Sequence, residues 1–253
     1  MSTDTWQRIY FTEPYKSPHI FYALFGTDNI NELSVSKSRH NVDIIPDELE
    51  IKNCCKTENQ DQKDYIEQFY AGFLGEILKE KDATLYEKVI NCNNVVVIKG
   101  EFPDSATLDY LRNTVGIIQA INETGITAIL DLHMLNWYEP ADWSTQFFAP
   151  RAPEVFRHVQ ILYSVESDGT WLHTHGMIKF GRPDISIKKI ATDKVELAIE
   201  IVNRFIQVFA NGLIPDENKG IRLRDMENEV YGKILGDYNN PDFNNYYFEI
   251  EGI

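Results

Sequence analysis

A strand–helix–strand pattern in the middle of the chain limits the possible folds most. Asn94-Val-Val-Val-Ile98 is a continuous apolar, β-branched run, which is typical of a strand buried on both faces of a sheet. Apolar residues recur at helical spacing over 105–123, Gly125 lies just beyond them, and a second apolar run follows at 126–134. Because the links are short, we expect a right-handed crossover between two parallel strands, a βαβ unit.

Further elements are expected on both sides of this unit. Helical spacing of apolar residues predicts helices over 65–79 and 193–211, and apolar runs predict strands at 19–25 and 246–250, the latter at a sheet edge. An alternating pattern around the turn residues Ser167-Asp-Gly169 predicts an antiparallel hairpin over 158–178. If those three residues form the loop, Tyr163 lies opposite His173 and Ile161 opposite His175, which puts both histidines on the apolar face.

These elements predict an α+β (or α/β) fold. We expect one mixed central sheet that contains the βαβ unit and the hairpin, with helices packed on the sheet. A chain of 253 residues is long enough to bury a sizeable core. We therefore expect residues 1–253 to form a single globular domain, with 213–253 as an acidic C-terminal extension.

Charge and cysteine content constrain partners and compartment. The chain has 24 Lys and Arg against 39 Asp and Glu, a formal net charge of −15, which disfavours nucleic acid and favours a basic protein partner. Cys54, Cys55 and Cys92 are an odd number without C-x-x-C spacing, as expected for reduced thiols in the cytoplasm. The sequence shows neither a signal peptide nor an apolar run of about 18 residues, so we expect no membrane insertion.

Two pairs of residues are candidate metal ligands and catalytic groups. His173 and His175 have i, i+2 spacing, which places two strand residues on one face, and Asp131 and His133 repeat that spacing near the end of the second parallel strand. If the two pairs meet, His173, His175 and His133 could bind zinc, with Asp131 as a further ligand or a general base. The alternative is that each histidine is half-buried and hydrogen-bonded to its own neighbours.

The loop at 136–150 is unusually rich in aromatic residues. A loop of this kind can act as a lid or bind a partner, or it can simply cover apolar surface. The candidate partner-binding residues are Trp137, Tyr138, Trp143 and Phe147.

Other catalytic patterns are weak. The chain has no G-x-S-x-G elbow for a nucleophilic serine and no glycine-rich phosphate loop before a helix. Cys92 has no base at a fixed spacing, and Glu139 and Asp142 lie in a loop where carboxylates are usually solvated.

The segment His173-Thr-His-Gly-Met-Ile-Lys-Phe-Gly-Arg-Pro-Asp-Ile185 indicates a strand, a bend at Gly181 and a new strand from Asp184. It also resembles the H-T-x-G-M-x-x-F-G-x-P-D type signature of uncharacterised bacterial families of unknown function. The resemblance covers 171–187 and extends weakly to 94–135. It implies a bacterial origin and a shared fold, and no reaction or cofactor.

Two functions of different class follow from these observations. The favoured one is a non-enzymatic binding or regulatory protein with an acidic surface. The alternative is a metal-dependent hydrolase that uses the histidine and aspartate candidates.

Overall fold

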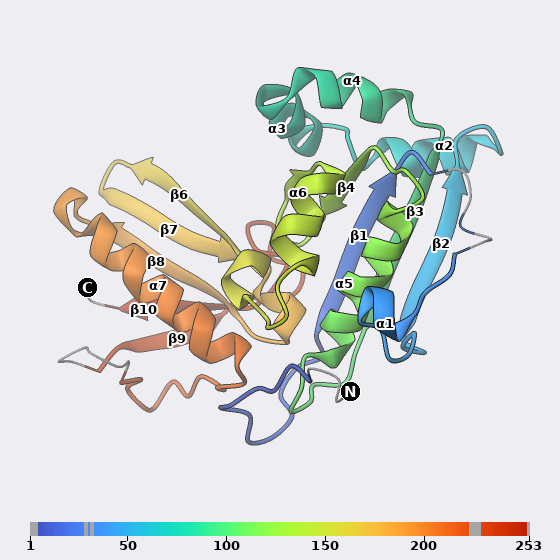
Figure 1. The fold of residues 1–253 in the computed structure, drawn as a ribbon. Coiled ribbons are helices and arrows are strands. Elements are labelled where there is room, and N and C mark those ends of the chain that lie inside the picture. The colour runs from blue at the N-terminus through green and yellow to red at the C-terminus, as the bar shows by residue number, and fades with distance from the viewer. Residues whose placement is uncertain (1–4, 28–29, 31–32, 223–228, 252–253) are drawn as a thin grey trace. The chain divides into compact units, whose positions relative to one another are not determined.

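The computed structural model describes residues 5–27, 30, 33–222 and 229–251, and this part of the chain is α+β (Figure 1). Its strands form two five-stranded sheets, where we expected one central sheet. Each sheet belongs to one of two compact units, so that the predicted βαβ unit and the predicted hairpin lie in different sheets. Unit 1 comprises Met1–Trp6, Ile20–Phe102 and Asp109–Pro153, and unit 2 comprises Gln7–His19, Pro103–Leu108 and Glu154–Ile253. That 1–253 folds as a single domain stays a prediction.

The sheet of unit 1 has the order β2-β3-β1-β4-β5. β1 pairs antiparallel with β4, and the Gly26 amide, just after β1, donates to the Asn94 carbonyl at the start of β3 over 2.9 Å, as in an antiparallel pair. β3 and β4 therefore run in the same direction with β1 between them. The helix α5 (Asp109–Asn122) connects β3 to β4, as predicted, but these two strands do not pair. The strands are β1 (His19–Phe25), β2 (Leu49–Cys55), β3 (Asn94–Glu101), β4 (Ala128–Asp131) and β5 (Asn136–Tyr138).

The helix expected over 65–79 is interrupted. α2 ends at Glu67 and α3 begins at Phe73, because the chain turns at Gly72, whose φ of 58° suits glycine. The apolar stripe nevertheless continues across the turn, since Ile66, Phe69 and Leu78 all enter the core of unit 1. The helices of this region are α1 (Lys37–His40), α2 (Gln60–Glu67), α3 (Phe73–Lys81), α4 (Ala83–Asn91) and α6 (Pro140–Trp143).

The sheet of unit 2 is mixed and has the order β6-β7-β8-β10-β9. β10 pairs parallel with β8 and antiparallel with β9, so the prediction that the last strand is an edge strand was wrong. The predicted C-terminal extension, 213–253, contributes two strands to this sheet in its described part. The strands are β6 (Gln160–Glu166), β7 (Gly169–His175), β8 (Asp184–Ile190), β9 (Tyr231–Leu235) and β10 (Tyr247–Glu251).

The helix α7 (Val195–Ala210) supplies much of the core of unit 2. Its boundaries lie close to the predicted 193–211. Phe205 and Phe209 pack against Phe248 of β10, with ring centroids 5.8 and 5.6 Å apart, and all three side chains are fully buried. Three single 3-10 turns complete the unit: Val155–His158, Met177–Phe180 and Thr192–Lys194.

The hairpin of β6 and β7 forms, but in a different register from the predicted one. Its loop has two residues, because Glu166 pairs with Gly169. Tyr163 consequently lies opposite Leu172, whereas a three-residue loop would place it opposite His173. A shift of one residue turns every side chain to the other face. The two histidines of β7 therefore face away from Tyr163.

Candidate functional site

Asp131 and His133 lie at a chain reversal in unit 1. β4 ends at Asp131, whose Oδ1 accepts hydrogen bonds from the amides of His133 and Met134, both at 3.0 Å. His133 is thus outside the strand, and the alternation that predicted a shared face does not apply. Asp131 is fully buried and has a second partner in Tyr22. Burial, together with the charge of Asp131, raises the pKa of Tyr22 well above its usual range.

His173 and His175 lie in unit 2 on one face of β7, as the spacing predicted. Their rings form an aromatic row: Trp171 stacks on His173 with centroids 4.1 Å apart, and Phe243 stacks on His175 at 6.0 Å. Burial lowers the pKa of His173, and burial together with the neighbouring His173 lowers the pKa of His175 to about 4. Both imidazoles are neutral at neutral pH.

The four candidates are therefore divided, with Asp131 and His133 in unit 1 and His173 and His175 in unit 2. Among the described residues, no group of three or more His, Cys, Asp or Glu side chains is placed to hold a metal ion.

The aromatic loop packs into the interior of unit 1. Trp137, Tyr138, Trp143 and Phe147 are each at most 6% exposed. Trp143 stacks on Phe147 with centroids 4.3 Å apart, and the Trp137 Nε1 donates to the Leu74 carbonyl over 2.9 Å. These side chains offer no exposed patch in this structure. Their role in partner binding stays a prediction without structural support, and the alternative, that the loop covers apolar surface, is the one this packing supports.

The segment 173–185, which contains Gly176 and Gly181, helps to build the interior of unit 2. Gly181 has a φ of 62°, and a Cβ atom there would lie 2.0 Å from the Lys16 carbonyl oxygen, so only glycine fits. The following Arg182 is buried and donates to Asp104 Oδ2 over 2.8 Å. Asp104 Oδ1 accepts from the guanidinium of Arg8, which is also buried. One carboxylate thus joins two arginines within the core.

The two guanidinium groups also bind the backbone around them. Three of the carbonyls to which they donate belong to the last residue of α7 or to residues just after it, where the helix dipole favours positive charge. Arg8 binds the carbonyls of Ala210, Ser105 and Phe180, and Arg182 binds those of Gly181, Gly212 and Leu213. We call Arg8, Asp104 and Arg182 the arginine clamp.

Asp184, at the start of β8, is a second fully buried carboxylate. Its oxygens accept hydrogen bonds from the Thr174 hydroxyl at 2.8 Å, the Met177 amide at 3.2 Å and the Asn245 side chain at 2.8 Å. Burial raises the pKa of Asp184 to about 7, although these hydrogen bonds and Lys179 act to lower it. Arg182 and Asp184 therefore each make buried polar contacts that stabilise unit 2. These contacts explain the Arg-Pro-Asp part of the segment without a binding or catalytic role.

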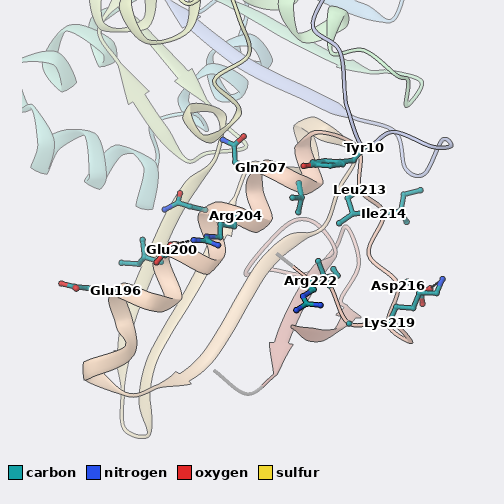
Figure 2. Close-up of a pocket in the computed structure, with 15 residues that line it drawn as sticks. Tyr10, Glu196, Glu200, Arg204, Gln207, Leu213, Ile214, Asp216, Lys219 and Arg222 are labelled. Atoms are coloured by element: carbon teal, nitrogen blue, oxygen red, sulfur yellow. Dashed lines mark hydrogen bonds and ion pairs between the residues drawn. The ribbon is translucent and has the colours of Figure 1, made fainter. Parts of the chain in front are cut away.

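A groove beside α7 is the candidate binding site. It has a volume of about 1430 Å³ and lies between the outer face of α7 and the segment 213–222. Figure 2 shows Glu196, Glu200 and Gln207 along the helix, with Asp216 and Lys219 on the facing segment. Its apolar lining consists of half-buried side chains: Ile199, Val208, Leu213, Ile214 and Ile221.

Six charged side chains of the described chain line the groove, three acidic and three basic, and four of them form ion pairs along its walls. On α7, Arg204 pairs with Glu200 over 2.5 Å, and on the facing segment Lys219 pairs with Asp216 over 2.8 Å. Glu196, nearest the start of α7, has no ion-pair partner among the described residues. The described lining residues include acids and bases but no histidine, cysteine or serine, so this part of the groove has no nucleophile and base pair of the usual kind.

Sequence reasoning did not identify this groove. Helical periodicity pointed to the buried stripe of α7, whereas the groove uses the opposite side of the same helix. The available signal was Ile199 and Val208, two apolar residues that lie off that stripe.

Comparison of the chain with family models, with curated proteins and with solved structures finds no match. Within the described residues, no helix has both the length and the apolar composition that crossing a bilayer requires.

Proposed function

We propose that this chain is a non-enzymatic binding protein that holds an extended segment of a basic partner protein in the groove beside α7. The carrying observation is the groove itself, a large concave surface with an apolar floor, a charged rim and, among its described lining residues, no catalytic pair. Pockets for small molecules usually have volumes of about 300–1,000 Å³. A volume of about 1430 Å³ suits a larger ligand.

The length of the groove supports a short peptide segment. Glu196 and Gln207 both line it, and they are separated by about 16 Å along the helix axis at a rise of 1.5 Å per residue. An extended chain advances about 3.3 Å per residue, so about five residues fit along this wall. Alternate side chains of such a segment would reach the apolar floor.

The acidic charge of the chain and the position of Glu196 support a basic residue in that segment. Glu200 and Asp216 are paired with Arg204 and Lys219, which leaves Glu196 on α7 to receive a cation, while Arg222 of the facing segment keeps the lining neutral overall. The net charge of −15 would draw a basic partner towards the chain and would make the association slower at high salt. The free thiols of Cys54, Cys55 and Cys92 support the cytoplasmic location that we propose with it.

Selection from a random peptide library on the immobilised protein tests this function. Selected peptides should combine apolar residues with Lys or Arg. In fluorescence anisotropy, Val208→Glu should weaken binding of a selected peptide about tenfold or more, because it places a charge on the apolar floor. Leu197→Glu is the matched control, since Leu197 is an exposed residue of α7 outside the groove, and it should change the affinity less than about twofold.

The charge arm of the same test uses Glu196→Lys, which should lower the affinity for basic peptides and reduce its dependence on salt. Glu48→Lys makes the same change in net charge at an exposed site in unit 1 and should have little effect. A selection that yields no peptide sensitive to Val208→Glu would contradict the proposed function.

No specific observation favours the metal-dependent hydrolase. Elemental analysis of protein purified without a metal-affinity tag discriminates between the two functions. A stoichiometric transition metal that is lost in His173→Ala would support the hydrolase.

A further inference from the structure

The outer strand of the unit 2 sheet, β6, carries two of the most exposed apolar side chains of the described chain. Tyr163 is 70% exposed and Val165 is 83% exposed. Both lie on one face of the strand, opposite Leu172 and Thr170 of β7. Among the strands of the described residues, β6 pairs only with β7, so its other side is an open edge. An exposed apolar edge strand is a template for pairing with another chain.

The hairpin determines which backbone groups point to that edge. A two-residue loop is closed by a hydrogen-bonded pair, here Glu166 and Gly169, and such pairs alternate with non-hydrogen-bonded pairs along an antiparallel ladder. Ile161, Tyr163 and Val165 therefore direct their N–H and C=O groups away from β7. The residues with outward backbone groups are the same ones that present apolar side chains.

β6 lacks the devices that usually protect an edge strand. Its sequence, Gln160-Ile-Leu-Tyr-Ser-Val-Glu166, contains no proline and no lysine, its only charge is at the end, and its pairing with β7 is continuous, without a bulge. The opposite edge of the same sheet differs, since β9 carries Lys233 in its centre, ion-paired with Glu251. Of the two edge strands of this sheet, β6 is therefore the one that lacks a central charge and can accept another strand.

We propose that β6 pairs with β6 of a second copy of this chain, forming a two-fold dimer in which the two unit 2 sheets join. An antiparallel register centred on Tyr163 places each Ile161 opposite the Val165 of the other copy and allows about six backbone hydrogen bonds. The charge pattern fits this register, because each Glu166 lies opposite a neutral Gln160 and the two Glu166 carboxylates are about 20 Å apart. The strand is thus complementary to itself.

Salt dependence separates this dimer from the partner proposed for the groove. Two copies of net charge −15 repel each other, and salt screens that repulsion, so the dimer should tighten as salt rises. Binding of a basic partner should weaken under the same change. The dimer is independent of the groove, and either proposal can fail alone.

Sedimentation equilibrium over micromolar to submillimolar concentrations, at low and high salt, tests the proposal. The wild-type protein should dimerise, and Val165→Lys should raise the dissociation constant about tenfold or more, because it puts a charged side chain in place of the apolar one that faces Ile161 of the other copy. Val165→Pro should act similarly, since it removes an N–H that only an added strand would use. Ile44→Lys is the matched control at an exposed apolar residue of unit 1, and it should leave the dissociation constant unchanged.

Disulfide cross-linking tests the register. In a background with Cys55→Ser and Cys92→Ser, Tyr163→Cys should form a covalent dimer under mild oxidation, because residues paired across the axis have Cα atoms about 5.5 Å apart. Glu166→Cys should not cross-link. Two outcomes overturn the proposal: a wild-type protein that is monomeric at every concentration, or a dimer that is indifferent to both changes at Val165.

Discussion

Asp104→Ala is expected to destabilise unit 2 by about 3–5 kcal/mol, the usual cost of removing one partner from a buried ionic group. The change leaves the guanidinium groups of Arg8 and Arg182 without their shared carboxylate in an interior where both side chains are fully buried. It also removes the acceptor of the Tyr15 amide, which in the wild-type structure donates to Asp104 Oδ2 over 2.9 Å. Amide hydrogen exchange in β8 during urea titration measures the effect within unit 2.

The matched control is Glu200→Ala, which removes an exposed carboxylate from Arg204 on the same unit. Exposed pairs contribute about 0–1 kcal/mol, so this variant should stay close to wild type. If Asp104→Ala costs no more than Glu200→Ala, the arginine clamp is not a main source of the stability of unit 2.

Replacing the three side chains of the clamp with apolar ones should also lower the stability of unit 2. Buried ion pairs can often be exchanged for apolar side chains of similar volume without loss. Here the arginines also satisfy backbone carbonyls at the end of α7, and those acceptors would lose their donors. The triple variant Arg8→Met, Asp104→Leu, Arg182→Met is therefore expected to remain less stable than wild type in the same exchange measurement.

Asp184→Asn is expected to remove a pH dependence worth about 4 kcal/mol from the stability of unit 2. The pKa of Asp184 is raised from 3.8 to about 7, so the folded protein holds a proton that the unfolded chain releases. The stabilisation from this group is complete below about pH 4 and is lost as the pH rises to about 7. The wild-type advantage over the variant should therefore fall across this range.

The measurement is the difference in unfolding free energy between wild type and Asp184→Asn from pH 4 to 8. Taking the difference cancels the contribution of His175, which is the same in both proteins. The pKa of His175 is lowered to about 4, so its contribution has the opposite sign, and the protein loses stability as the pH falls below 6.5. The slope is the readout, because the asparagine amide also disturbs the contact with Asn245. Asp47→Asn, at an exposed site of unit 1, should give a curve parallel to wild type, and a parallel curve for Asp184→Asn would refute the assignment.

Local sequence patterns predicted the regular elements well. The α+β class is confirmed, and the boundaries of β1 and α7 lie within two residues of prediction. These elements depend on apolar periodicity and turn residues, which are local properties. The interrupted helix at Gly72 shows the limit, since an apolar stripe can continue through a turn when its side chains still reach one core.

Pairing between distant strands was not visible in the same patterns. Nothing near β3 or β4 indicates that β1 inserts between them, and nothing in 246–250 indicates that β10 has neighbours on both sides. The candidate site was affected in the same way. The face of the hairpin to which His173 and His175 were assigned depended on the register, and a loop shorter by one residue reverses that face. The face shared by Asp131 and His133 depended on a strand that instead ends at Asp131.

The arginine clamp has a consequence for how this chain can be made. Arg8, Asp104 and Arg182 come from the three separate stretches of sequence that compose unit 2, and stretches of unit 1 lie between them. On the ribosome, Arg8 and Asp104 emerge long before Arg182, so this interior closes only late in translation. A fragment that begins at residue 154 would contain Arg182 but neither Arg8 nor Asp104. Its core would therefore hold the charge of Arg182 without the carboxylate that neutralises it in the whole chain.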